Sequence, residues 1–286
     1  MIRSSINPGA IADAETPLVS DDGLTFRRVK TLQEYHECVT IQEETWGVNF
    51  RERVPSAILL VGQKLGGVCA AAFAPGGRML GFVFGMTGTY KGEPAHWSDL
   101  LAVRQEARDR HVGERLKRYQ RQLCRAQGVN TIYWTFDPLV ARNAHLNLKL
   151  LGARASEYVV NMYGSNTGSP LHGTLETDRW VAAWDLAPSN DSRVVPSPID
   201  GGVFVVRPSS DGPAPITNAF ADAAVIRVAV PKEFGALPHE DRVAWRDATR
   251  GAFLHYLGLG YQVVSFHRAT LEQPPFYELS ADTPHR

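Results

Sequence analysis

The sequence predicts an α/β (α+β) protein in which a sheet is flanked by helices and followed by a smaller C-terminal module. Three observations predict this class. Two β-rich runs, Val68–Phe73 and Leu80–Met86, flank a Pro-Gly-Gly turn, an alternation of strand and helix patterns extends from His96 to Leu151, and a strand-helix-strand pattern lies near the end. The length of 286 residues is sufficient for about two domains.

Composition and charge exclude several classes of protein. Hydrophobic residues make up 44% and charged residues 21%, which is typical of a globular chain. Lys plus Arg total 30 and Asp plus Glu total 30, so no overall charge favours a nucleic acid or a membrane surface. The cysteines Cys38, Cys69 and Cys124 are too widely spaced for a zinc site, and no export signal or membrane span is evident. We therefore expect a cytoplasmic protein.

The first elements follow from capping and alternation. Residues 1–23 are expected to form a flexible tail, and Leu24–Val29 a short strand. Thr31 and Glu34 have the spacing of a capping box, which predicts a helix to about Thr45 that Trp46-Gly47 ends. The two β-rich runs that follow predict antiparallel neighbours.

The central segment predicts a strand at His96–Val103, a basic turn at Arg104–Arg110, and a helix that extends to Gln127. The helix is amphipathic, with one apolar stripe and a basic face that is expected to be exposed. The stripe consists of Val112, Leu116, Tyr119, Leu123 and Ala126, and the basic face of Arg115, Lys117, Arg118, Arg121 and Arg125. A strand at Asn130–Phe136 and a helix at Ala141–Leu151 are expected next.

The last third of the chain predicts a linker and a separate module. Residues 187–223 are rich in Pro, Ser, Gly and Asp around an apolar island at Val203–Val206, so we expect an irregular connection. A β-α-β module is expected over residues 224–286. The helix of this module has three possible roles: it packs on the sheet, it covers a binding site, or it joins two copies of the chain in a homodimer. The periodicity of its apolar residues does not distinguish these roles. The predicted elements are Val225–Val230, Asp241–Leu257 and Tyr261–Phe266.

The turn before the amphipathic helix is the strongest candidate for a binding site. A helix start offers free N–H groups and a positive dipole end, and Arg108 and Arg110 add charge there. Gly113 would let the backbone approach a phosphate. The alternative, which spacing alone favours, is an ordinary amphipathic helix with a solvated basic face.

The same turn resembles the pyrophosphate motif Arg/Gln-x-x-Gly-x-Gly/Ala of the GNAT acyl-coenzyme A N-acyltransferases. The matching positions are Arg108, His111 and Gly113, with His111 in place of the first glycine. The chain is also similar to a predicted-acetyltransferase subfamily, and this similarity covers nearly everything after the tail. The matching sequence segments are Gln42–Gly47, Trp134–Leu139, Asn143–Ala153, Thr177–Arg179 and Trp245–Arg250.

This resemblance implies an acyltransferase domain over residues 24–186, with a mixed, strongly twisted sheet in which two neighbouring strands splay apart around pantetheine. It implies an acyl-CoA co-substrate, acetyl-CoA by default and succinyl-CoA as an option, no metal, and a small amine as acceptor, with an amino acid as one candidate. Leu101 and Val103 would pair with the pantetheine. The other expected cofactor-binding residues are Arg108, Arg110, His111, Val112, Gly113, Glu114 and Asn143.

The resemblance also implies residues for the chemistry. Asp99, on the strand before the turn, and Glu43 or Glu44, at the end of the first helix, are candidate bases. Asp99 should share a strand face with Trp97 rather than with His96 and Ser98.

Many family members have a Tyr where this chain has Leu148. Tyr158 and Tyr163 lie just downstream and are the candidate thiol acids, with Tyr163 taken first. The alternative, which is the commoner case for a tyrosine in a strand after a helix, is a packed aromatic residue.

Substrate binding is expected at Asp137 and Arg179, which flank predicted strands, and at Trp46; the alternatives are turn chemistry for the first two residues and core packing for Trp46. The subfamily usually has His at Asp99 and glycines at Asp109 and His111. Asp109 and His111, together with Leu148 in place of the usual tyrosine, support a second hypothesis, a GNAT-like ligand-binding or interaction protein that has lost catalysis.

Overall fold

The computed structural model describes residues 14, 16–170, 173–187, 198–218 and 221–281. Contacts divide the chain into two compact units. The first comprises residues 1–134, 167–170 and 185–190, and the second comprises 135–166, 171–184 and 191–286. The boundary falls inside the segment 24–186 that the sequence groups as one domain, so those domain limits stay a prediction.

The first unit contains a mixed sheet whose strands follow one another in the order β1-β2-β3-β4-β5-β6. Neighbours from β1 to β5 are antiparallel, whereas β5 and β6 are parallel. Because helices flank this mixed sheet, the predicted α/β class is confirmed. The strands are β1 (Leu18–Val19), β2 (Thr25–Arg28), β3 (Val68–Phe73), β4 (Met79–Tyr90), β5 (Glu93–Val103) and β6 (Thr131–Phe136).

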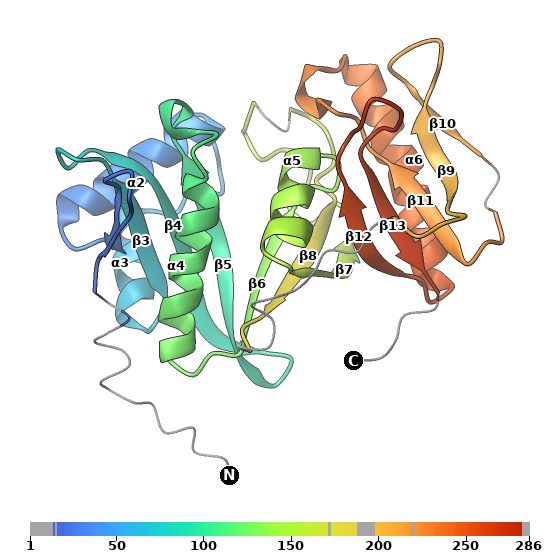
Figure 1. The fold of residues 1–286 in the computed structure, drawn as a ribbon. Helices are drawn as coiled ribbons and strands as arrows, with labels where there is room; N and C mark the ends of the chain where they lie inside the picture. The colour runs from blue at the N-terminus through green and yellow to red at the C-terminus, as the bar shows by residue number, and fades with distance from the viewer. Residues whose placement is uncertain (1–13, 15, 171–172, 188–197, 219–220, 282–286) are drawn as a thin grey trace. The chain divides into compact units, whose positions relative to one another are not determined.

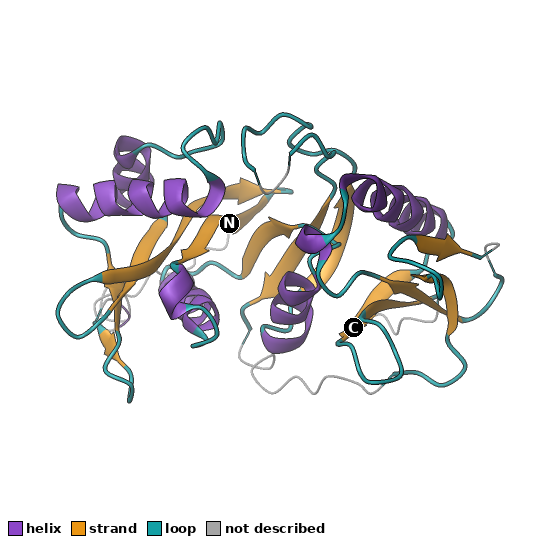
Figure 2. Cartoon of the chain, turned by 90° about the horizontal axis from the view of Figure 1, so that it is seen from above, coloured by secondary structure: helices purple, strands orange, loops and turns teal. Residues whose placement is uncertain are grey.

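Helices cover both faces of this sheet (Figures 1 and 2). Helices α2 (Leu32–Trp46) and α3 (Ser56–Lys64) lie on one face, where Tyr35, Leu59 and Phe82 belong to one buried apolar cluster. Helix α4 (Val112–Ala126) lies on the other face and buries its predicted apolar positions Val112, Leu116, Tyr119 and Leu123. The capping box at the start of α2 is confirmed, since Thr31 and Glu34 each accept a hydrogen bond from the other's backbone N–H.

A β-bulge at Asp99 changes the faces of β5. Ser98 pairs with Gly85 and Leu100 with Phe84, so Asp99 is the extra residue. Before the bulge, Ser98 contacts α4. After it, Leu100 joins the cluster on the α2 side, while Leu101 lies near Gly113 of α4. The bulge therefore lets two residues three positions apart, Ser98 and Leu101, face the same helix.

The second unit contains a five-stranded sheet of order β10-β9-β11-β13-β12, with α6 (His239–Gly258) contacting β9, β10 and β11. Strands β11 and β12 are both antiparallel to β13, so the predicted β-α-β module is present. The same unit holds the antiparallel pair β7 (Arg154–Val159) and β8 (Arg179–Asp185). The strands of the five-stranded sheet are β9 (Val203–Pro208), β10 (Pro215–Thr217), β11 (Val225–Ala229), β12 (Gln262–His267) and β13 (Phe276–Ser280).

Several expected irregular or single elements differ in the structure. Strand β1 and Asp22 lie inside the expected tail, whose residues 1–13 and 15 are outside the described part. The interval 187–223, read as a linker, holds β9 and β10, and its residues 188–197 and 219–220 are not described. The helix predicted at Ala141–Leu151 is a short α5 (Ala141–Ala144) followed by a π-helical segment, His145–Leu150.

Candidate functional site

Strands β5 and β6 of the first unit pair briefly and then part. Parallel pairs join His96 with Ile132 and Trp97 with Tyr133, and no residue of the described segment Ser98–Val103 pairs with β6. We name Ser98–Val103 together with Trp134 the fork, because Ser98 and Trp134 are the first residues beyond the last pair. Strand β5 keeps its pairing with β4 up to Val103, so one edge of this segment stays without a strand partner. The fork is a place where an extended ligand could pair with β5.

The turn that follows β5 keeps a backbone suited to glycine. Asp109 and His111 have φ angles of 64° and 54°. These values lie in the left-handed region, which glycine adopts freely and most other residues adopt rarely. These are the two positions where the resembling subfamily has glycines. The departure therefore lies in the side chains of the turn, while its backbone keeps the glycine-type conformation.

Helix α4 begins directly at this turn. His111 is its N-cap residue and no side chain caps the first turn, so the backbone N–H groups there are available to an anion. A Cβ on Gly113 would lie 3.7 Å from side-chain atoms of Leu101 and Val103, an ordinary contact distance. Gly113 therefore brings the bare helix backbone to the half-buried Leu101 and Val103 of β5. This arrangement joins the fork to a helix N-terminus.

The charges beside the turn are partly paired within the first unit. Asp22 accepts hydrogen bonds from Arg115 at 2.9 and 3.0 Å and lies 3.3 Å from Arg110. Hydrogen bonds from Arg115 hold the pKa of Asp22 well below its ordinary range. Glu114 pairs with Arg118 at 2.9 Å, and Arg108 is exposed. An incoming phosphate would thus compete with Asp22 for two arginines.

Lys117 is buried beneath the fork, which corrects the expectation that it faces solvent with the arginines. Its side chain is 2% exposed, and Nζ donates to Ser98 Oγ at 2.8 Å and lies 3.8 Å from the ring centroid of Trp134. Burial lowers the pKa of Lys117 to about 7. Helix geometry explains the error, because Gly113, Lys117, Gln120 and Cys124 form a second inward stripe that apolar periodicity does not detect.

His96 lies beside this lysine as a neutral ring. Thr87 Oγ1 donates its proton to Gly66 O, so it accepts from His96 Nδ1 at 2.9 Å, and Gln120 donates to His96 Nε2 at 3.0 Å. Burial and the charge of Lys117 lower the pKa of His96 to about 3. His96 and Ser98 do share the α4 face, as expected, and the cluster carries one positive charge at most near neutral pH, on Lys117.

Asp99 is exposed on the bulge, and its carboxyl pKa is raised. The causes are desolvation and then the negative charge of Glu52, from the loop between α2 and α3. A raised pKa increases the proton affinity of this carboxylate, which suits a general base. Sequence reasoning missed Glu52, because no pattern relates that loop to the bulge.

Two other predicted residues of the first unit have structural contacts. Glu43 forms an ion pair with Arg53, and Glu44 pairs instead with the buried Arg104 at 2.8 Å. Trp46 is the last residue of α2, packs partly buried against the apolar cluster and stacks on Phe50 with centroids 5.4 Å apart. These contacts favour packing for Trp46.

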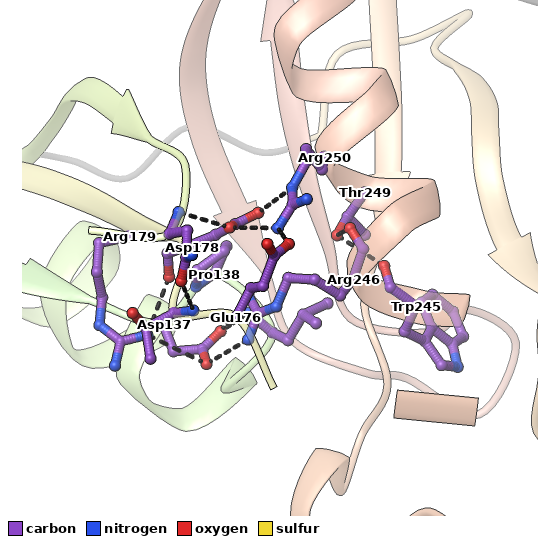
Figure 3. A network of polar contacts seen from close by, with 12 residues as sticks. Asp137, Pro138, Glu176, Asp178, Arg179, Trp245, Arg246, Thr249 and Arg250 are labelled. Carbon is purple, nitrogen blue, oxygen red and sulfur yellow. Dashed lines mark hydrogen bonds and ion pairs between the residues drawn. The ribbon is translucent and has the colours of Figure 1, made fainter. Parts of the chain in front are cut away.

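In the second unit, Asp137 and Arg179 belong to a network with Arg246 of α6 (Figure 3). Arg246 donates to both carboxylate oxygens of Asp137 at 3.0 and 2.7 Å, and Arg179 lies 3.4 Å from the same carboxylate. Burial acts to raise the pKa of Asp137, but the charges of Arg246 and Arg179 outweigh it and hold the pKa low. The carboxylate is occupied by arginines from its own unit, which favours a structural role.

A neighbouring pair in the same network repeats this pattern. Arg250 donates to both oxygens of Asp178 at 2.8 and 2.7 Å, and Glu176 lies 2.6 Å from Arg250. Tyr158 also donates to Asp178 at 2.7 Å. Helix α6 therefore packs in its own unit through two arginines, one turn apart, that each bind a carboxylate: the half-buried Asp137 and the fully buried Asp178.

Tyr163 and Asn143 also lie in the second unit, whereas the turn and the fork belong to the first. Tyr163 is 37% exposed, its hydroxyl lies 3.1 Å from Thr135 Oγ1, and the Arg179 guanidinium lies 5.6 Å from its ring centroid. The structure thus gathers Tyr163, Arg179 and Asp137 in one unit. Asn143 lies half-buried in α5.

No metal site or membrane helix is found in the described part of the chain. No group of three or more His, Cys, Asp or Glu side chains there is placed to hold a metal ion. No helix among the same residues combines the length and hydropathy that a membrane span requires. All three cysteines are buried and free.

Among known proteins, only solved structures show similarity to this chain. No protein-family model matches the sequence, and no curated protein matches it. An N-acetyltransferase from Staphylococcus aureus Mu50 is 15% identical over 58% of this chain and 99% of its own, with a TM-score of 0.46. The ribosomal-protein-S18-alanine N-acetyltransferase from Escherichia coli is 14% identical over 60% and 99%, with a TM-score of 0.45. Arabidopsis thaliana NAA60, in complex with a bisubstrate analogue, is 14% identical over 57% and 98%, also at 0.45.

Proposed function

We propose that the chain is an acyl-CoA-dependent N-acyltransferase that transfers an acetyl or succinyl group to a small amine. The observation that carries the proposal is the fork, which leaves the β5 edge at Ser98–Val103 free of a strand partner and leads to the start of α4. An extended pantetheine arm needs backbone partners along one edge, and a pyrophosphate needs N–H groups at its end. The first unit supplies both.

The reaction would be direct transfer within one complex. The amine nitrogen attacks the thioester carbonyl carbon, the C–S bond breaks, and its electron pair leaves with the sulfur. Asp99 would accept a proton from the substrate ammonium and so free the nitrogen lone pair that attacks, because its raised pKa makes it a stronger base than an ordinary aspartate. Glu43 remains an alternative base and Tyr163 the proposed acid for the leaving thiolate.

Donor binding would use the turn as well as the fork. Leu101 and Val103 would offer backbone groups, and the N–H groups from His111 to Glu114 would meet the pyrophosphate, with Arg108 and Arg110 adding charge. Val112 is buried, so its contribution would come from the backbone alone. Asn143, Asp137, Arg179 and Trp46 stay proposals for the remaining donor and acceptor contacts, with an amino acid as one candidate acceptor.

The first test is isothermal titration of the full chain with acetyl-CoA, succinyl-CoA and coenzyme A. Micromolar binding that favours one acyl form is expected, and turnover of that donor over a panel of amines and amino acids should follow. No binding of any of the three would overturn the proposal. The alternative, a ligand-binding or interaction protein without catalysis, is favoured by the carboxylate of Asp109 in the turn, and it predicts weak or absent coenzyme A binding.

A further inference from the structure

Lys117 is a buried cation without an anionic partner. Its nearest polar contact is the neutral hydroxyl of Ser98 at 2.8 Å, and its other neighbour is the face of Trp134 at 3.8 Å. Within the described residues, no carboxylate forms an ion pair with it. Other buried cations of this chain are paired: Arg104 with Glu44 and Arg246 with Asp137. A buried charge left without a counter-charge costs stability, so its retention points to a use.

The position of the ammonium indicates that use. Ser98 and Trp134 are the first residues of β5 and β6 beyond the last parallel pair, Trp97 and Tyr133. Because Lys117 contacts both, its Nζ lies at the point where the two strands part. Among the described residues, one hydroxyl and one aromatic face meet the three N–H bonds of this ammonium, so it retains donor capacity for a ligand at the fork.

We propose that Lys117 is a donor-binding residue whose ammonium receives the thioester carbonyl oxygen of an acyl-CoA that enters the fork. This inference rests on the proposed function and assigns to Lys117 the recognition of the acyl group rather than of coenzyme A itself. A charge-assisted hydrogen bond in a water-poor site would hold the oxygen more tightly as negative charge develops on it during attack.

The groups around Lys117 allow this role. His96 on β5 is neutral because burial lowers its pKa to about 3, and Cys124 on α4 is a thiol because burial raises its pKa to about 12. Arg28 on β2 also acts to lower the pKa of His96. In the part of the chain that the structure describes, no carboxylate neutralises the ammonium, so an oxygen from a ligand would meet a full charge below about pH 7.

The test compares two ligands that differ only in the acyl group. Isothermal titration of the full chain with acetyl-CoA and with coenzyme A, at pH 6, is performed on the wild type, Lys117→Met, Lys117→Arg and Lys64→Met. Lys117→Met should bind acetyl-CoA about tenfold more weakly, as expected for one lost charge-assisted bond, and coenzyme A equally well. Lys117→Arg should recover part of the loss. Lys64 is exposed at the end of α3, so its variant controls for the removal of a lysine charge.

The pH dependence supplies a second readout. Between pH 6 and pH 8.5 the wild-type preference for acetyl-CoA over coenzyme A should fall, since the ammonium loses its proton, while the preference of Lys117→Arg should stay constant. If Lys117→Met bound acetyl-CoA and coenzyme A equally more weakly than the wild type, Lys117 would have a structural role only. If its affinity for acetyl-CoA were unchanged, Lys117 would not contact the acyl group. If the wild type bound neither ligand, the proposed function and this inference would both be overturned.

Discussion

At the residue scale, Asp99 links the shape of β5 to its chemistry. The bulge exposes its carboxylate, and desolvation together with Glu52 raises its pKa. If Asp99 is the base, kcat/KM should fall as the pH drops through this raised pKa, because the protonated form cannot accept a proton. The acid limb of the profile should therefore have its midpoint above 3.8, the ordinary value.

Asp99→Asn should remove this limb and lower kcat/KM by about 10²–10⁴-fold, the usual contribution of a general base. A pH–rate profile of the variant and the wild type with the best donor and acceptor makes the measurement. Glu43→Gln is the matched comparison, since Glu43 is already paired with Arg53. If kcat/KM fell in Glu43→Gln and not in Asp99→Asn, Glu43 rather than Asp99 would be the general base.

Lys117 predicts an unusual pH dependence of stability. Its pKa is about 7 in the folded chain and 10.5 ordinarily, so between these values the unfolded chain binds a proton that the folded chain does not. The free energy of unfolding should therefore rise with pH across that window. Lys117→Met should be more stable than the wild type at pH 6, by on the order of a few kcal/mol, and lose this advantage as the pH approaches 10.5.

Urea denaturation of both proteins at pH 6, 8 and 10 measures this difference. A variant less stable than the wild type at pH 6 would show that the ammonium stabilises the fold, against the expectation from its burial.

His111 predicts a gain from glycine. Its φ of 54° is left-handed, and glycine adopts that conformation without steric cost, so His111→Gly should stabilise the chain by about 1 kcal/mol. Arg110→Gly is the control, because Arg110 is not among the residues with positive φ and should lose stability instead. If the turn has the described backbone, thermal melts should show a higher melting temperature than the wild type for His111→Gly and a lower one for Arg110→Gly.

At the element scale, the two arginines of α6 show how the helix is held in the second unit. Asp137 accepts from Arg246 and Arg179, so Asp137→Asn would leave two buried guanidinium groups without their carboxylate. Arg246→Met would leave Asp137 with Arg179 still at 3.4 Å. We expect Asp137→Asn to cost about 3–5 kcal/mol and Arg246→Met less, since breaking a buried pair is worse when more charge is stranded.

Chemical denaturation of both single variants and the double variant tests this order. The double variant should lose less than the sum of the single losses, because the two residues share one interaction. Additive losses would show that the two side chains act independently.

How well each element could be predicted depends on where its signal lies. The helix at Leu32–Trp46 carries its own start in Thr31 and Glu34, and β3 was predicted at its observed bounds because its signal is a continuous apolar run. Helix α3 was missed, since Gly62 interrupts its pattern. That glycine is required by packing, because an added Cβ would lie 2.9 Å from the ring of Phe84.

The fork itself was expected only from the resemblance. The bulge at Asp99, the burial of Lys117 and the approach of Glu52 depend on how β5 meets its neighbours, and no local pattern encodes such contacts. Asp137 and Arg179 were predicted to lie at strand ends, and they do, but Arg246 comes from 109 residues further along the chain than Asp137. Long-range partners of this kind decide whether a charged loop residue is free for a ligand.

At the scale of the whole molecule, the chain passes repeatedly between its two units. The first unit includes segments from beyond Trp134, since Arg51 N donates to Thr167 O at 2.9 Å and Leu186 N to Asn130 O at 2.9 Å. A chain that ends at Trp134 should therefore lack backbone partners at both places. We expect it to show weaker amide protection than the full chain, most clearly near Arg51.

Hydrogen exchange of the full chain and of the chain that ends at Trp134 measures this effect. Equal protection in the two would show that the first unit folds without its later segments. Circular dichroism of both proteins distinguishes local loss of protection from global unfolding.

The extra residue in β5 has a consequence for how this site can change. Most strand residues sit opposite a partner, and a substitution there alters the packing of the sheet. Asp99 has no residue opposite it, so the pairing of β5 with β4 on either side does not depend on which side chain occupies that position. A substitution of Asp99 by histidine would therefore change the proton affinity of this position while the strand pairing around it stays the same.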